Sequence, residues 1–447
     1  QFQVPLRIPP QLAPKRTDAA TDYYEINIRP AQVDILPGKR TTIWGYDGMF
    51  PGPTIRARSG RTSIVRQINN LPVETNVHLH GGAVAPEHDG GMHEMIAPDS
   101  FRDYVYPNNQ IASTLWYHDH SMHRTAQNVY MGLAGFYLIE DSFEARLNLP
   151  SGEYDVPLML QDRLFNGDGS FNFPAHNHEG INGDTILVNG VPQPYFQVAQ
   201  RTYRFRILNA SNSRHYELAL SNGQPFPSGR RPFLTLPQPM LQIASDGGLL
   251  SAPVPRPTIA IAPAERVEVV IDFARYPVGS QIILKNKLGR GATADVMRFD
   301  VTRKTTDTSR VPAVLRPITP LDGAVVTRDF ELSVNREGMW VINGLPFDHQ
   351  RVDARPKLGS TEIWNVINRS NVPHPFHIHL VMFQILDRNG AKPPAGEAGW
   401  KDTANVGPLE TVRLIAKFNG FTGKYMFHCH NLHHEDHMMM LQFEVVS

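Results

Sequence analysis

The stretch HCHNLHHEDHMMM, residues 428–440, contains the only cysteine in a chain of 447 residues. The residues before it, KYMF (424–427), are rich in aromatic side chains and follow a glycine, which predicts a β-strand that runs into the stretch. Successive side chains on a strand point to opposite faces, so Cys429 points one way and His428 and His430 point the other. A thiolate and two imidazoles on opposite faces cannot share one small metal site. They can serve two sites that are joined by the backbone of three residues.

One of these two sites has the residue types of a blue-copper centre. A thiolate, two histidines and a weak axial methionine form the ligand set that such centres use for electron transfer. His434 and Met439 follow the cysteine by five and ten residues and are candidates for one histidine and the methionine. The other histidine is expected in HPFHIHL (374–380), where His374 is out of phase with the two later histidines and is free to point to the cysteine's side. The predicted mononuclear site comprises His374, Cys429, His434 and Met439.

An internal repeat predicts the architecture around these residues. Three segments share an alternating strand that ends in Ile-Asn or Leu-Asn, namely SIVRQINNLP (63–72), YRFRILNASN (203–212) and TEIWNVINRS (361–370). Short β-rich runs are separated by turn signals, 37 prolines and 34 glycines punctuate the chain, and long amphipathic helical patterns are scarce. The sequence therefore predicts an all-β protein of three sandwich units, with boundaries near residues 150 and 310.

Histidine pairs occupy matching positions in the two outer repeats. Nine residues after the repeat asparagine come His78 and His80 in the first unit, His377 and His379 in the third, and Leu218 and Leu220 in the middle one. Each outer unit carries a second pair, His118 with His120 and His428 with His430. Chance would give about one such pair in the chain. The fifth pair, His176 and His178, lies in a polar loop and is expected to be solvated.

Eight placed histidines match a cluster of two three-histidine coppers and one two-histidine copper. The alternatives are zinc sites and ordinary core histidines with satisfied hydrogen bonds. Structural zinc sites close with four ligands and favour two or more cysteines, so one cysteine with this many histidines fits copper better.

Composition limits the other function classes. The chain has 43 Lys and Arg and 43 Asp and Glu, and a net charge of zero argues against a polyanionic partner such as nucleic acid. No apolar run approaches the roughly 20 residues of a membrane span. One cysteine permits no internal disulfide and gives no indication of the redox compartment.

Four segments resemble the copper signatures of the multicopper oxidases: HLHGG (78–82), WYHDH (116–120), HPFHIHL (374–380) and HCHNLHHEDHMMM (428–440). The likeness to the branch of bacterial spore-coat laccases and bilirubin oxidases continues through WGYDGMFPGPTI, SGEYDVPL, ILVNG, YRFRILNASN, SDGGLL, APAERVEVVIDF and GWKDT. It implies three consecutive cupredoxin-like domains, which are Greek-key β-sandwiches. Residues 1–150 would hold an N-terminal arm and cluster ligands, 151–310 no copper ligand, and 311–447 the type 1 copper and the remaining cluster ligands.

The resemblance also implies roles for single residues and four copper ions. His78 and His377 resemble the type 2 ligands, whereas the type 3 ligands correspond to His80, His118, His120, His379, His428 and His430. Met439 stands at the family's axial position of the type 1 copper. Glu435 and Asp89 match family acids that supply protons near the dioxygen site. The alternatives for these two are an exposed charge at a helix start and an Asp-Gly turn.

The activity that the resemblance implies is laccase-type. One-electron oxidation of phenols or aromatic amines would be coupled to four-electron reduction of dioxygen to water, with bilirubin or cuprous-ion oxidation as alternatives within the same class. A scaffold relative that has lost its copper is the rival from another class, and the complete ligand set argues against it. We expect a small aromatic reductant and dioxygen as partners, a monomer, and an extracytoplasmic or spore-coat location.

Three further segments attract attention. Gln224 to Met240 is expected to be longer than its spore-coat counterpart, and the link Leu71 to Asn76 shorter. The loop HDGGMHEM (88–95) carries two histidines and two methionines near the first histidine pair. It could bind an extra cuprous ion, although a role in lining a loop is the preferred interpretation.

Overall fold

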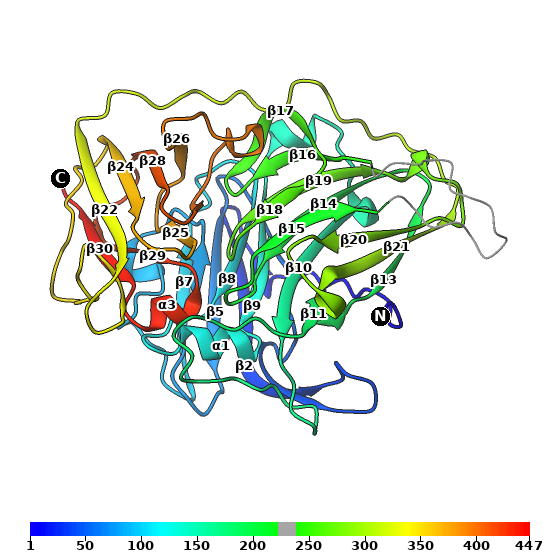
Figure 1. Ribbon diagram of the computed structural model, residues 1–447, viewed down its shortest axis with the longest axis horizontal. Helices are drawn as coiled ribbons and strands as arrows, with labels where there is room; N and C mark the ends of the chain where they lie inside the picture. The colour runs from blue at the N-terminus through cyan, green and yellow to red at the C-terminus, as the bar shows by residue number, and fades with distance from the viewer. Residues whose placement is uncertain (222–237) are drawn as a thin grey trace.

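Three pairs of β-sheets follow one another along the chain in the computed structural model, which describes residues 1–221 and 238–447 (Figure 1). Each of these sheets contains strands from one third of the chain only. We propose the division into three domains near residues 150 and 310 on this basis. Most of the segment Gln224 to Met240, whose length was expected to differ from spore-coat laccases, lies outside the described residues.

The first unit, blue to cyan in Figure 1, pairs a five-stranded sheet with a four-stranded one. The five-stranded sheet has the order β1-β2-β5-β7 with β3 on β2, and the other has the order β4-β9-β8-β6. The elements are β1 (Arg16–Thr17), β2 (Thr21–Val33), β3 (Thr41–Tyr46), β4 (Ile55–Arg58), β5 (Thr62–Asn69), β6 (His78–His80), η1 (Pro86–His88), β7 (Ser100–Tyr106), β8 (Ser113–His118), α1 (Thr125–Met131), β9 (Ala134–Glu140) and α2 (Ser142–Ala145).

The middle unit, green in Figure 1, has a seven-stranded and a five-stranded sheet. Their orders are β12-β11-β10-β14-β19-β16-β17 and β13-β21-β20-β15-β18. The elements are η2 (Gly152–Tyr154), β10 (Asp155–Arg163), β11 (Thr185–Val188), β12 (Val191–Pro192), β13 (Tyr195–Ala199), β14 (Thr202–Asn209), β15 (Tyr216–Leu220), β16 (Met240–Ser245), β17 (Gly248–Arg256), β18 (Ile259–Ile261), β19 (Arg266–Asp272), η3 (Phe273–Arg275), β20 (Gln281–Asn286), η4 (Gly291–Ala294) and β21 (Asp295–Arg303).

The third unit, yellow to red in Figure 1, repeats the plan of the first. Its five-stranded sheet has the order β23-β22-β24-β28-β26, and its four-stranded sheet has the order β27-β25-β29-β30. The elements are β22 (Val326–Val334), β23 (Trp340–Ile342), β24 (Thr361–Asn368), β25 (His374–Ile378), β26 (Phe383–Arg388), η5 (Ala395–Glu397), β27 (Thr403–Val406), β28 (Thr411–Lys417), β29 (Gly423–Cys429), α3 (Leu432–Asp436) and β30 (Met440–Val445).

The repeat asparagines have a common structural role. Asn368 ends β24, where its side-chain amide donates to the carbonyl of Val372 at 2.8 Å and its side-chain oxygen accepts the N–H of Ser370 at 2.9 Å. Asn69 at the end of β5 and Asn209 at the end of β14 make the corresponding bonds with the loops that follow them. An asparagine that bonds the backbone two residues onward forms an Asx turn, so each copy turns the chain at the same point before its next strand.

A hydrophobic core lies between the two sheets of each unit. In the third unit, Trp364 of β24 and Phe427 of β29 come from different sheets, and their ring centroids are 4.9 Å apart. In the middle unit, Leu218 and Leu220 occupy the places of the histidine pairs and are buried in its core. Leucines at these two positions therefore give apolar packing where the outer units have a polar strand face. Burial of each leucine side chain stabilises the fold by roughly 1.5–3 kcal/mol.

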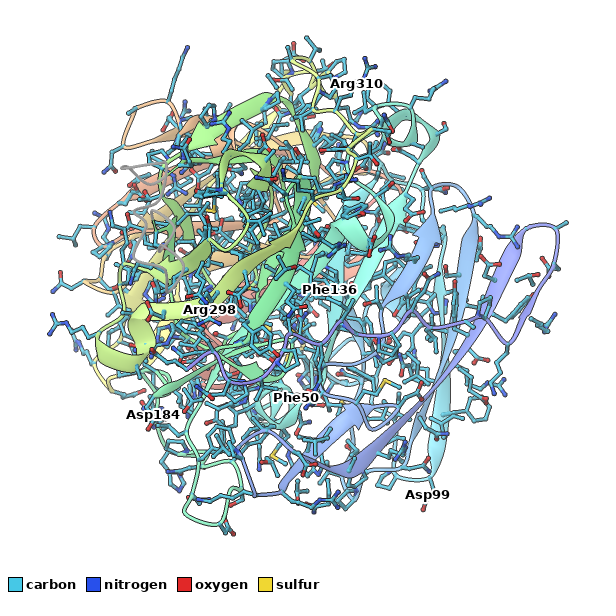
Figure 2. All side chains as sticks on the ribbon, turned by 90° about the vertical axis from the view of Figure 1, so that its right-hand side faces the viewer. Phe50, Asp99, Phe136, Asp184, Arg298 and Arg310 are labelled. Carbon is cyan, nitrogen blue, oxygen red and sulfur yellow. The ribbon has the colours of Figure 1, made fainter. Side chains whose placement is uncertain are left out.

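The N-terminal arm contacts the middle unit before it reaches the first. The N–H of Leu6 donates to the carbonyl of Tyr195 in β13 at 2.8 Å, and the guanidinium carbon of Arg298 lies 5.2 Å from the ring centroid of Phe2. Arg298 is labelled in Figure 2 on the yellow-green strands of the middle unit. Further along, the N–H of Leu12 donates to the carbonyl of Thr54 in the first unit at 2.8 Å. The arm thus ties two units together. Among the described residues, no helix is long and apolar enough to cross a membrane.

Candidate metal centres

Cys429, His374 and His434 lie together at the end of the third unit. Cys429 ends β29, His374 begins β25, and His434 lies on the short helix α3. The Cys429 Sγ is 3.5 Å from the His374 Nδ1 and 3.6 Å from the His434 Nδ1, and the two ring nitrogens are 3.3 Å apart. All three side chains are fully buried. Burial raises the pKa of the Cys429 thiol, so a bound cation is needed to keep it as thiolate.

The loop after the cysteine is folded so that it returns to the same place. Asn431 caps α3, since its side-chain oxygen accepts from the N–H groups of His433 and His434. The N–H of Met439 donates to the His434 carbonyl at 3.0 Å, and the Cys429 N–H donates to the Met439 carbonyl at 3.1 Å. Met439 is fully buried in the same apolar cluster as Cys429. This loop therefore places the expected axial methionine beside the thiol.

In both imidazoles of this group, Nδ1 faces the cysteine sulfur and Nε2 on the other side of the ring has a hydrogen-bond partner. The His434 Nε2 donates to the Glu179 carbonyl at 3.1 Å, and the His374 Nε2 is 3.1 Å from the Ser370 hydroxyl. Holding the proton at Nε2 leaves the Nδ1 lone pair of both rings facing the sulfur. The ring of Trp340 packs against both imidazoles, with centroid distances of 4.8 Å to each.

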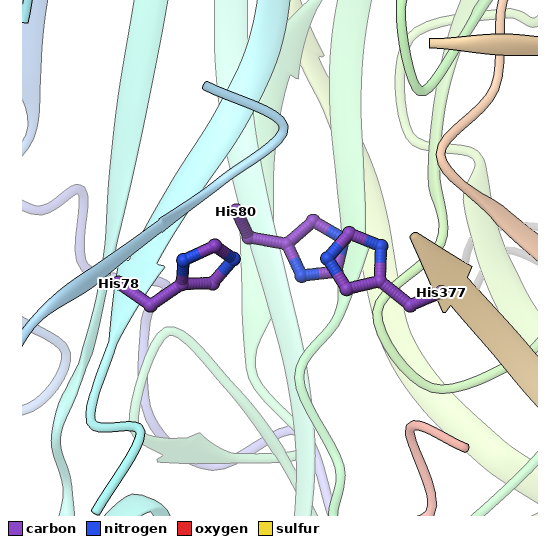
Figure 3. A group of neighbouring side chains, drawn as sticks. All are labelled: His78, His80 and His377. Carbon is purple, nitrogen blue, oxygen red and sulfur yellow. The ribbon is translucent and has the colours of Figure 1, made fainter. Parts of the chain in front are cut away.

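The eight histidines of the four strand pairs meet between the first and third units. His78 is paired with His118 across β6 and β8, and His377 is paired with His428 across β25 and β29. The two units interleave their rings: His80 stacks on His377, as Figure 3 shows, and the two ring centroids are 3.7 Å apart. His78 stacks in the same way on the third unit's His379, at 3.9 Å.

Their ring nitrogens converge in three groups, within each of which the ligand atoms lie within 4.8 Å of one another. The groups are His78 with His80 and His377, His80 with His118 and His430, and His120 with His379 and His428. Within the last group the His428 Nε2 is 3.2 Å from the His120 Nε2 and 3.0 Å from the His379 Nε2.

The donor set fits metal ions. Several fully buried ring nitrogens have no hydrogen-bond partner among the described residues, namely His78 Nε2, His80 Nδ1, His118 Nε2, His120 Nδ1, His377 Nε2 and both nitrogens of His430. A buried nitrogen without a partner is costly, and a metal ion between such atoms removes that cost. Burial also lowers the pKa well below the usual range for His80, His118, His120, His377, His379 and His430. These rings are therefore neutral, which is the form that binds metals.

Backbone carbonyls decide which nitrogen each ring presents. The Nδ1 of His78, His118, His377 and His428 donates to the carbonyl of Asp89, Asp119, Asp402 and Cys429 respectively, at 2.7 to 3.0 Å. These rings present Nε2 to the centre. His80 is reversed, because its Nε2 donates to the carboxylate of Asp402 at 2.9 Å and its Nδ1 is left for the centre.

Sequence reasoning did not find the residue that orients His80. Asp402 is fully buried, and its carboxylate accepts two hydrogen bonds from Arg266 of the middle unit, Nη1–Oδ1 at 2.9 Å and Nη2–Oδ2 at 2.5 Å. Its backbone N–H donates to Asp246, also of the middle unit, at 3.1 Å. The segments GWKDT and APAERVEVVIDF contain Asp402 and Arg266. Asp402 directly precedes β27 and Arg266 is the first residue of β19, so the signal that could have found them is a charged residue at the start of a strand.

The two predicted carboxylates lie against the histidines. The His379 Nδ1 donates to the Asp89 Oδ2 at 2.8 Å. The Glu435 Oε1 is 3.2 Å from the His120 Nε2, and its Oε2 is 3.3 Å from the His428 Nδ1. Both carboxylates are buried rather than exposed at a turn or helix start, and burial raises the pKa of each. They are therefore placed to hold a proton beside the centre.

The chain belongs to the multicopper oxidase family. Residues 27–144 and 321–447 match two family models, each described as multicopper oxidase. It is similar to the laccase of Bacillus stratosphericus, with 38% identity over 525 residues that cover 100% of this chain and 99% of the relative. It is also similar to the bilirubin oxidase of Albifimbria verrucaria, with 41% identity over 471 residues that cover 99% of this chain and 81% of the relative.

Comparison with solved structures also places the chain among the multicopper oxidases. The crystal structure of a laccase from Pediococcus acidilactici matches with a TM-score of 0.90 and 34% identity, covering 100% of this chain and 94% of that one. The predicted all-β architecture of cupredoxin-like domains is thus confirmed. The chain is a laccase-type copper oxidoreductase with dioxygen as acceptor, and the family uses four copper ions: type 1, type 2 and a type 3 pair.

Proposed function

We propose that this chain oxidises phenols or aromatic amines at a mononuclear copper held by His374, Cys429, His434 and Met439. The single observation that supports this assignment most strongly is the position of Cys429. It lies with two imidazoles on one face of β29, while its neighbours His428 and His430 lie among the histidines on the other. Two centres on opposite faces of one strand, joined by the backbone of three consecutive residues, suit transfer of electrons from one to the other.

We assign the other coppers by the convergence of ring nitrogens. His78 and His377 would hold the type 2 ion. The type 3 ions would be held by His80, His118 and His430 on one side and by His120, His379 and His428 on the other. Copper supplies the reversible one-electron chemistry that amino-acid side chains lack. The chain supplies the connection: Cys429 is bonded covalently to both His428 and His430, and the His428 Nδ1 donates to the Cys429 carbonyl at 3.0 Å.

The protein's own groups control protons and water. Reduction of one dioxygen to two waters consumes four protons inside a site whose histidines are essentially inaccessible to solvent. Glu435 and Asp89 are the carboxylates that we propose as catalytic groups, since each lies within 3.3 Å of an imidazole of the centre. Asp436 follows Glu435 in the chain and is less deeply buried, and burial raises its pKa to about 8, so we propose it as the next proton carrier outward.

Small aromatic reductants are the substrate class that the comparisons favour. The relative from Bacillus stratosphericus is a laccase. The resemblance to laccases implies phenols or aromatic amines as the reductants. Bilirubin is the second candidate, because the 41% identical relative is a bilirubin oxidase. We further propose that the protein acts as a monomer, since every ligand assigned to either centre comes from one chain. An extracytoplasmic location is proposed on the resemblance to spore-coat laccases.

Copper content, colour and turnover of the pure protein test this function. The loaded protein should hold four copper ions and be blue. Cys429→Ser should abolish the blue colour and all oxidase turnover while most copper of the histidine centre stays, because His428 and His430 remain. A Cys429→Ser variant that is still blue would show that the type 1 assignment is wrong. Turnover of a phenol, bilirubin and cuprous ion, measured side by side on the unmodified protein, decides the substrate class.

A further inference from the structure

One apolar cluster at the edge of the histidine centre consists almost entirely of methionines. Its members are Met92, Met122, Met426, Met438 and Met440, together with Phe347. They are five of the chain's 14 methionines. The large cores of the described residues are built from aliphatic and aromatic side chains with only one or two methionines among them. Methionine often fills gaps in a core, but gap filling does not explain five methionines in one small cluster.

The cluster adjoins the type 3 histidines. Met122 follows His120 by two residues, and Met426 precedes His428 by two residues on the same face of β29. Met440 of β30 is the direct register partner of His428. Met426 and Met440 are thus on the face of the strands opposite to Cys429, and the cluster is distinct from the axial methionine of the mononuclear site.

The other side of the cluster reaches the protein surface. Met122 and Met438 are half-buried, whereas Met440 is fully buried. Met92 is followed by the exposed His93, whose ring centroid is 4.3 Å from that of the exposed His349. Thioethers therefore extend from an exposed histidine pair to the histidine centre.

The backbone at Met438 supports a functional interpretation. Its φ is +81°, in the left-handed region that a long side chain such as methionine rarely adopts. Strain of this kind persists where the surroundings hold it, and it is concentrated at binding and active sites. Here it lets consecutive methionines point to different places, Met439 to the mononuclear group and Met440 to the cluster.

We propose that this methionine cluster is a binding site for one cuprous ion, in addition to the four coppers of the family. Thioethers are soft, neutral donors and select Cu(I) over zinc or other hard divalent ions. The position of the cluster at the rim of the histidine centre makes it an entry station at which a cuprous ion is held before it reaches the imidazoles. The loop 88–95, in which an extra cuprous ion was considered from the sequence, contributes Met92 to the site, and the other donors come from three distant segments.

Anaerobic titration of the reduced, fully loaded protein tests this site. Protein whose four coppers, blue colour and phenol turnover have been verified is reduced and titrated with Cu(I) in competition with the chromophoric chelator bicinchoninate. A fifth ion should bind, and its X-ray absorption should show sulfur neighbours. The double variant Met92→Leu/Met426→Leu should lose the fifth ion while it keeps four coppers and phenol turnover, because leucine preserves the packing volume and removes the sulfur.

A matched control separates the site from a general effect of removing methionines. Met240→Leu/Met297→Leu changes two buried methionines in the core of the middle unit and should leave the fifth ion in place. The proposal is overturned if the unmodified protein binds only four ions, or if the Met92/Met426 variant binds the fifth as tightly as the control does. Either result leaves the oxidase function intact, since colour and phenol turnover are measured on the same samples.

Discussion

Asp402→Asn should weaken copper binding at the histidine centre without removing the blue colour. The substitution keeps the shape of the side chain but replaces one oxygen by an N–H donor. In the native protein the Asp402 Oδ1 accepts from the His80 Nε2 at 2.9 Å and the Arg266 Nη1 at 2.9 Å, and Oδ2 accepts from the Arg266 Nη2 at 2.5 Å. Either orientation of the asparagine therefore sets one amide N–H against a donor.

The magnitude follows from these contacts. Removing one partner of a buried, hydrogen-bonded charge pair costs about 3–5 kcal/mol of folding free energy. Loss of a partner that orients a metal-binding histidine costs roughly 10–100-fold in metal affinity or activity. If the asparagine presents its N–H to His80, the ring has to accept with Nε2 and carry its proton on Nδ1, the nitrogen that faces the centre. We therefore expect roughly 10–100-fold slower oxidase turnover.

The assay compares the two centres in one sample. After dialysis against a chelator, the variant should retain its blue absorption, which reports Cys429, and should lose copper from the type 3 pair. Asp155→Asn is the matched control, because Asp155 is a buried carboxylate in a two-bond pair with Arg206, at 2.8 and 2.9 Å, away from the histidines. It should cost similar stability and no copper. Equal copper loss in both variants, or full copper and normal turnover in Asp402→Asn, would refute the orienting role of Asp402.

Three other outcomes are expected. Glu435→Gln should leave reduction of the blue copper by substrate near normal and slow reoxidation by dioxygen by roughly 10²-fold, which stopped-flow absorption separates; unchanged reoxidation would remove Glu435 from the proton path. Met439→Leu should raise the potential of the blue copper in a redox titration at a cost below about 1.5 kcal/mol, while Met438→Leu leaves it unchanged; the reverse result would show that the loop register is wrong. Although burial opposes it, the charges of Arg206 and Arg204 hold the pKa of Asp155 below its ordinary value. The urea-unfolding advantage of wild type over Asp155→Asn should therefore be complete above the unfolded value of 3.8 and shrink as the pH falls below it; an advantage independent of pH would argue against an ionised Asp155.

The division of the histidines between two centres was predictable because it depends on strand parity alone. A strand alternates its faces without exception over a few residues, so the odd and even positions of HPFHIHL and HCH already separate His374 and Cys429 from the other histidines. The repeat asparagines were visible for a similar reason. Each forms its turn with residues that are near neighbours in the sequence, and such local hydrogen bonds leave a local pattern.

The residues that orient the histidine ligands were not predictable, because their hydrogen bonds join segments that are far apart in the sequence. Asp402 is 322 residues from His80 and 136 residues from Arg266, and no spacing rule connects them. His80 presents Nδ1 rather than Nε2 to the centre because its Nε2 is hydrogen-bonded to Asp402 and lies near the Thr403 hydroxyl, both far away in the sequence. The methionine cluster has the same origin: Met92, Met122 and the methionines of residues 426–440 are far apart in the sequence, and only the fold brings them together.

The interleaved histidine rings make copper a participant in the docking of the first unit on the third. Each unit supplies four of the eight imidazoles, and the stacked pairs His80 with His377 and His78 with His379 each join one ring from either side. Copper that binds only the docked arrangement adds to its stability by mass action, about 2.7 kcal/mol for each ion present at a hundred times its dissociation constant. The melting temperature therefore depends on the free copper concentration. When a cell supplies too little copper to the newly made chain, the docked arrangement lacks this stabilisation. The two sheet faces lined with unpaired imidazoles are then exposed to solvent for longer.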